Sequence, residues 1–193
     1  MRRLFLLTVV ALFTFVGLAN AQELEPLNFK GIPVTGTSEE FGRALESIGF
    51  VEDNNEEDVY SGVFLGRDVV VGLLGEKSDP ITDFGVYMLS IDSWIELESE
   101  FVRCIDIYSA KFGNPLVLET YFDTYVGDDD SLKLQAVLDD NCIYVAGWSL
   151  PQGQIYISIS RGYEYGIGRG AVLVSYSITA KKEELKRSYL EEI

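Results

Sequence analysis

The sequence contains no histidine, and this absence excludes several kinds of active site. Ser-His-Asp and Cys-His nucleophilic sites need an imidazole, as does histidine-ligated zinc, and histidine is the commonest general base near neutral pH. Cysteine is nearly as scarce, and Cys104 and Cys142 cannot supply the four nitrogen or sulfur ligands of a structural zinc site. The sequence therefore predicts no metal and no cofactor.

Positive charge is also scarce. The chain has 15 lysine and arginine residues against 31 aspartate and glutamate residues, a formal net charge of −16. A surface of this sign repels nucleic acid phosphates and anionic lipid, because it lacks the counterion release that basic patches exploit. Nucleic-acid binding is therefore excluded. The acidity itself has two interpretations, solubility or attraction to a basic partner, and we favour solubility.

Long apolar runs are confined to the N-terminus. Residues 1–3 form a short positive segment, residues 4–18 an apolar run, and residues 19–21 an A-x-A cleavage site. At about 15 residues the run is shorter than the ~20 that a membrane-spanning helix needs. We therefore expect residues 1–21 to be a cleaved signal peptide, the protein to be periplasmic or secreted, and no transmembrane segment to remain. Cleavage would leave 13 basic against 31 acidic residues, a charge of −18.

An exported chain meets an environment in which disulfides persist. A bridge between Cys104 and Cys142 would close a loop of about 39 residues and contribute roughly 4 kcal/mol in the chain-entropy model. The alternative is two separate buried thiols, since cysteine is among the most buried residue types. We expect the disulfide.

Two segments place apolar residues at helical spacing, and each follows a capping motif. Thr37 and Glu40 precede the first segment, and Ser93 and Glu96 precede the second, which contains Cys104. Runs rich in β-branched and aromatic residues predict strands at residues 60–65, 68–74, 83–90, 116–122, 132–138, 142–150, 154–161 and 171–178.

This order predicts a two-layer α+β fold, an antiparallel sheet of about seven to eight strands with two main helices on one face. The domain spans residues 22–179, and residues 180–193 form a charged C-terminal tail or helix. The pattern E-F-x-R-x-[LI] occurs at residues 40–45 and again at 100–105. It suggests a tandem helix-plus-meander repeat, with halves at residues 29–90 and 91–179.

Several short motifs support a resemblance. They are F-K-G-I-P-V-x-G at residues 29–36, E-F-x3-L-x3-G-F at 40–50, Y-S-G-x-F-x-G at 60–66, W-x2-L at 94–97, K-F-G-N-P at 111–115 and G-x-I at 153–155. In these motifs the chain resembles a group of small uncharacterised exported proteins of Gram-negative gut-type bacteria. The element order also resembles the β-lactamase-inhibitor-protein-like fold, with one helix per repeat where two are usual. The resemblance implies a fold and no activity.

One glycine-rich loop is the best candidate for a binding site. Residues 161–170 lie between two predicted strands, which excludes a dinucleotide-binding turn because that motif needs a helix after its glycines. The loop gathers Arg161, Tyr163, Tyr165 and Arg169, and tyrosine and arginine are typical interface anchors. The alternative is a hairpin end whose tyrosines cover the sheet edge.

Other chemistries find little support. Ser109-x-Lys111 and Ser131-x-Lys133 lack the S-x-x-K spacing of Ser-Lys enzymes. The run at residues 53–64 lacks the glycine and final glutamate of a calcium-binding EF-hand loop.

We therefore expect a non-catalytic secreted or periplasmic module that binds a protein or glycan through loops at one sheet end or through the exposed sheet face. One alternative is a carboxylate-dependent hydrolase acting on glycan, which needs two carboxyls ~5–10 Å apart with one desolvated. The other is a structural envelope component.

Overall fold

The computed structural model describes residues 25–162 and 169–179. The predicted signal peptide, Tyr163, Tyr165 and the predicted tail lie outside these residues. The described chain folds into one large antiparallel sheet, three helices and a small hairpin of β1 (Asn28–Phe29) and β2 (Ile32–Pro33). The predicted α+β class with a large antiparallel sheet is confirmed.

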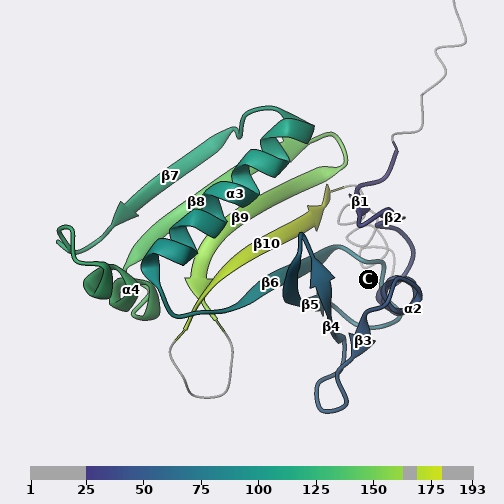
Figure 1. Cartoon of the computed structure of the whole chain (residues 1–193). Coiled ribbons are helices and arrows are strands. Elements are labelled where there is room, and N and C mark those ends of the chain that lie inside the picture. Colours follow the sequence, from purple (N-terminus) through teal and green to yellow (C-terminus); the bar gives the residue numbers. More distant parts are fainter. Residues whose placement is uncertain (1–24, 163–168, 180–193) are drawn as a thin grey trace, which may run out of the picture.

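The large sheet has eight strands in the order β3-β4-β5-β6-β10-β9-β8-β7 (Figure 1). Their bounds are β3 (Val51–Glu52), β4 (Val59–Phe64), β5 (Arg67–Leu74), β6 (Asp83–Ile91), β7 (Val117–Phe122), β8 (Cys142–Leu150), β9 (Gly153–Arg161) and β10 (Gly170–Ile178). Each half of the sheet is a four-stranded meander, and the two meanders meet where β6 pairs with β10. This order is that of two helix-plus-meander units, although a duplication of the sequence stays a prediction.

Both main helices begin at the predicted caps. In α2 (Ser38–Ser47) the Thr37 hydroxyl accepts a hydrogen bond from the Glu40 amide, and the Glu40 carboxylate accepts one from the Thr37 amide. In α3 (Trp94–Phe112) the Ser93 hydroxyl accepts from the Glu96 amide. The helix α3 packs over β9 and β10 (Figure 1), α2 contacts β5, and the buried residues of both helices belong to one core on the same face of the sheet.

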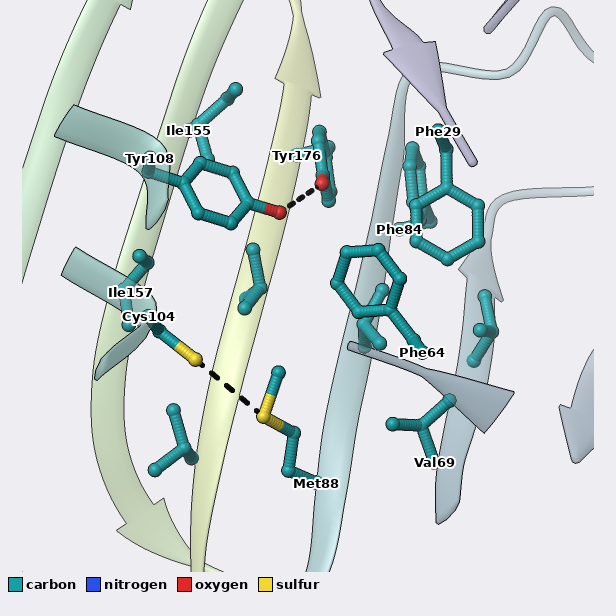
Figure 2. Close-up of a cluster of buried hydrophobic side chains, with 14 of the residues drawn as sticks. Phe29, Phe64, Val69, Phe84, Met88, Cys104, Tyr108, Ile155, Ile157 and Tyr176 are labelled. Carbon is teal, nitrogen blue, oxygen red and sulfur yellow. Dashed lines mark hydrogen bonds between the residues drawn. The ribbon is translucent and has the colours of Figure 1, made fainter. Parts of the chain in front are cut away.

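One hydrophobic core runs under both helices. Phe84 on β6 packs against Phe41 of α2, with ring centroids 5.1 Å apart, and stacks on Tyr176 of β10 at 4.4 Å. The Tyr176 hydroxyl is hydrogen-bonded to that of Tyr108 on α3 (Figure 2). Burial raises the pKa of both phenols, so they stay protonated and hydrogen-bonded. Phe84 and Tyr176 therefore connect the two units through shared aromatic packing.

The predicted strand at residues 132–138 is wrong, because this segment is helix α4 (Asp130–Leu138). The Asp129 carboxylate caps it by accepting hydrogen bonds from the Ser131 and Leu132 amides. Ala136 and Val137 are both buried, and adjacent residues of one strand would point to opposite faces. The eighth strand of the sheet is instead the two-residue β3, which sequence reasoning missed.

The expected disulfide is not formed in the structure, where both cysteines are free. Cys104 points from α3 into the core, and its thiol lies 3.6 Å from the Met88 sulfur on β6 (Figure 2). Cys142 begins β8 beside Phe122, and two strands, β10 and β9, separate β8 from β6. The structure therefore agrees with the alternative interpretation of the sequence, in which the two cysteines are separate thiols.

The two thiols should differ in reactivity. Cys104 is fully buried, and burial raises its pKa to about 12. Cys142 is half-buried, and burial is also the main reason why its pKa is raised to about 11. We expect iodoacetamide to label Cys142 slowly in the folded chain and Cys104 only after unfolding, as counted by mass spectrometry. A Cys142→Ser variant should take up no label until denaturant is added. A chain that takes up label only after reduction would contain the disulfide instead.

Candidate functional site

The two arginines of the predicted loop site lie together at the base of the β9–β10 hairpin. Arg161 is paired with Gly170 across the hairpin, and the Gly162 amide donates to the Arg169 carbonyl at 2.7 Å. Tyr163 and Tyr165 lie outside the described residues. The structure thus brings Arg161 and Arg169 together, while a role of these arginines in binding and the positions of the two tyrosines stay predictions.

Both of these guanidinium groups already have acidic partners. Arg161 lies 3.7 Å from the Asp140 carboxylate, and Arg169 Nε lies 3.0 Å from Asp92 Oδ1. The Arg169 N–H is not aligned with an acceptor, so this second contact is an ion pair rather than a hydrogen bond. The partners neutralise the charge that would otherwise make this hairpin base a cationic site.

A pocket of about 280 Å³ lies near this hairpin base. It opens between the β4–β5 turn, the end of β6 and α3, and Ile91 in its wall pairs with Gly170 of β10. Its lining residues are Gly66, Arg67, Asp68, Met88, Ile91 and Glu100. Sequence reasoning missed this pocket, because residues 67, 88 and 100 meet only in the folded chain.

Glu100 is the acidic side chain that is buried in the described part of the chain, with 2% of its surface exposed. Arg67 lies 3.3 Å from Glu100 Oε2, and Arg103 binds both carboxylate oxygens of Glu100. Burial acts to raise the pKa of Glu100, but the hydrogen bonds and charges of Arg103 and Arg67 outweigh it and lower the pKa. Glu100 is therefore held ionised, and it fastens α3 to the β4–β5 turn.

This arrangement does not suit acid–base hydrolysis. A general acid of a glycosidase needs a carboxyl whose pKa is raised, and the buried carboxyl in this pocket has a lowered pKa. The nearby thiol of Cys104, 3.8 Å from Glu100 Oε1, has its pKa raised to about 12 first by burial and then by Glu100, which is the reverse of an activated nucleophile. The pairing of Glu100 with Arg67 and Arg103, together with the direction of both pKa shifts, therefore favours a structural brace over a catalytic centre.

The face of the sheet opposite the helices is the second candidate site. Along β9 the buried Ile155, Ile157 and Ile159 alternate with half-buried residues, and β10 alternates in the same way. On this open face three rows of residues pair across β6, β10, β9 and β8, and the outermost of them, Asp83, Ser177, Gln154 and Ser149, begins with an acidic residue. Of the other two rows, one is Tyr87, Leu173, Ser158 and Val145, and the next is Gly85, Ser175, Tyr156 and Gly147. We call the eight residues of these two rows the open-face patch.

The open-face patch carries no charged side chain, although 24% of all residues in the chain are charged. Acidic residues flank it, with Asp83 at the beginning of β6 and Glu119 on the edge strand β7. A solvated sheet face of an acidic protein would ordinarily carry charges. Surfaces that bind other molecules are often poor in charged residues and rich in tyrosine, and the open-face patch has this composition.

Two glycines allow tyrosine side chains to lie along the patch. A Cβ atom added to Gly147 would lie 2.7 Å from Tyr156 Cε1, and one added to Gly85 would lie 3.3 Å from Tyr87 Cε2. The Tyr156 ring therefore occupies the space that a side chain at position 147 would fill, whereas a side chain at position 85 would be in tight contact with Leu173 Cδ1, at 3.1 Å, and with the Tyr87 ring. The alternation of isoleucine with serine and tyrosine along residues 154–160 indicates a strand with one buried face and one open face. The contact between tyrosine and glycine could not be predicted, because it depends on the register of different strands.

In residues 25–162 and 169–179 no group of three or more cysteine, aspartate or glutamate side chains is placed to bind a metal ion. Over the same residues no helix is long and apolar enough to span a bilayer. Comparisons with protein-family models, curated proteins and solved structures found no match, so the resemblance to small exported proteins stays a prediction.

Proposed function

We propose that this protein is a non-catalytic binding module of the periplasm or the extracellular space, and that it contacts its partner through the open-face patch. The single observation that carries this proposal is the uncharged composition of the patch in a chain of net charge −16. A surface without charges can be dehydrated at a lower cost than the acidic surface around it, since burying an unpaired charge is expensive.

The rigidity of the surface supports the same function. The patch lies on four paired strands whose other face is packed on the core, so its side chains are held in place before a partner arrives. A preorganised surface loses less conformational entropy on binding than a loop does. The competing hydrolase function is weaker, because the buried carboxyl of the pocket is ionised rather than poised to donate a proton.

Placing a charge on the patch should abolish partner binding. We expect Val145→Lys and Leu173→Lys to lose the component that co-purifies with the tagged wild-type chain from cells that export it. Ile95→Lys is the matched control, because Ile95 is 62% exposed on α3, in the helix layer on the other face of the sheet. It should retain the component.

Bound material should be analysed for both protein and sugar, and each variant should be checked for folding by circular dichroism. If both patch variants bind the same components as the wild-type chain, the proposed function is contradicted. Loss from Ile95→Lys together with the patch variants would also contradict it, because the effect would then follow net charge rather than the patch.

A further inference from the structure

We infer that the ligand of the open-face patch is an uncharged polysaccharide, an inference that rests on the proposed function and names its partner. Sugar rings present C–H groups on their faces and hydroxyl groups at their edges. A surface that recognises them therefore needs exposed aromatic rings for the faces and neutral hydroxyl or amide groups for the edges. The patch offers half-buried tyrosine rings and neutral hydroxyl groups.

The two tyrosines supply the aromatic groups. Tyr156 leans across β8 over Gly147, and Tyr87 leans along β6 over Gly85, so that both rings lie along the sheet rather than standing away from it. Gly85 and Gly147 belong to the same row, with Ser175 and Tyr156 between them. Neighbouring strands are ~4.8 Å apart, and three strand spacings separate Gly85 from Gly147. The two places where a ring lies, over Gly85 and over Gly147, are therefore roughly 14 Å apart. That separation suits a chain of several sugar units better than a single sugar.

Neutral polar groups surround the rings. Ser175 lies in the row of the two ring sites, and Ser158 lies in the adjacent row. Ser177 and Gln154 pair with each other in the next row of the same face, whose residue on β6 is Asp83. A serine hydroxyl both donates and accepts a hydrogen bond, and so does a glutamine amide, which matches the hydroxyl groups of a sugar without requiring charge.

The charge of the chain decides which polysaccharides fit. Acidic polysaccharides would be repelled by a chain of net charge −16, and the patch offers no cation to offset that repulsion. Glu119 on the neighbouring strand β7, opposite Val145, adds to the repulsion. The geometry and the charge together point to a neutral glycan chain laid across β6, β10, β9 and β8.

Affinity electrophoresis of the purified chain tests this inference. Native gels would contain barley mixed-linkage β-glucan, xyloglucan, galactomannan or dextran, and one further gel would contain polygalacturonate as the acidic polysaccharide. We expect at least one neutral polysaccharide to retard the wild-type chain and polygalacturonate not to. The Tyr87→Ala/Tyr156→Ala double variant should bind at least tenfold more weakly, because both aromatic surfaces are lost.

Two further variants separate stacking from other effects. Tyr156→Phe keeps the ring and should keep most of the retardation, and Tyr125→Ala should keep all of it, because Tyr125 is 97% exposed outside the patch. Retardation by none of the four neutral polysaccharides, or equal retardation of the double variant, would overturn the inference. If the patch variants lose a protein partner while no polysaccharide binds, the proposed function stands and the glycan ligand is rejected.

Discussion

Replacing both Arg67 and Arg103 with methionine is expected to destabilise the fold by about 3 kcal/mol or more, because it leaves the buried Glu100 carboxylate without a positively charged partner. The Glu100 side chain is only 2% exposed while α3 stays packed, so it must either remain charged without a counterion or take up a proton. Both outcomes cost folding free energy at neutral pH. Urea denaturation at pH 7 measures the loss.

A third substitution should reverse much of the effect. Adding Glu100→Leu to the double variant removes the buried charge, and an apolar side chain of similar size suits a site lined by Met88 and Ile91. Replacement of a whole buried ion group by apolar residues is often neutral or stabilising. We therefore expect the triple variant to be more stable than the double variant. A triple variant that is no more stable than the double would contradict the account of Glu100 as a paired buried charge.

A surface ion pair provides the matched control. Arg43 lies 3.9 Å from Glu39 on α2, and both side chains are mostly exposed. Arg43→Met should change stability by about 0.5 kcal/mol or less, because solvent screens such a pair. A loss for Arg43→Met as large as that for the double variant would attribute the effect to lost positive charge in general rather than to the burial of Glu100.

The pH dependence should follow from the same group. The folded pKa of Glu100 is below its ordinary value of 4.5, so the stability that the ion group contributes is fully present above that value and is lost as pH falls through the folded pKa. Without the arginines, burial raises the pKa of Glu100 instead, and protonation relieves the unpaired charge. The difference in unfolding free energy between wild type and the double variant should therefore shrink as pH falls from 7 to 4.

Phe84→Ala is the second large expected effect, about 3–5 kcal/mol, since a buried aromatic ring is removed from the centre of the core. Its ring contacts Phe29, Phe41 and Tyr176, and the last of these belongs to the second helix-plus-meander unit. Because the two units share this packing, we expect them to unfold together. Both tryptophans, Trp94 and Trp148, lie in the second unit, so their fluorescence reports on that unit alone.

The measurement is thermal unfolding of Phe84→Ala followed by tryptophan fluorescence and by far-ultraviolet circular dichroism. The two transitions should coincide and shift together to lower temperature. A dichroism change that precedes the fluorescence change would show that the first unit unfolds by itself, which contradicts a shared core. Tyr125→Ala removes an exposed aromatic ring and should leave the midpoint almost unchanged.

Local sequence patterns determined most of the secondary structure. The caps at Thr37 and Ser93 begin α2 and α3 as predicted, because capping joins residues only three positions apart. Seven of the eight predicted strands are present with bounds close to those expected. Successive side chains of a strand point to opposite faces of the sheet, so the pattern of apolar residues within one segment is enough to indicate a strand. The strand predicted at residues 132–138 is wrong because apolar residues at alternate positions also occur in a short helix, and the Asp129 carboxylate caps this one.

The sequence by itself determined the α+β class, the acidic charge, and the absence of histidine-dependent chemistry, because each depends on composition or on neighbours in the chain. The tertiary structure decided which residues meet. Arg67 and Glu100 are 33 positions apart, and Tyr108 and Tyr176 are 68 apart. Tyr156 lies over Gly147 only because β8 and β9 pair in one particular register, and a shift of one residue would turn every side chain to the other face. The ionised Glu100, the free thiols and the uncharged open-face patch therefore follow from packing, which no local pattern specifies.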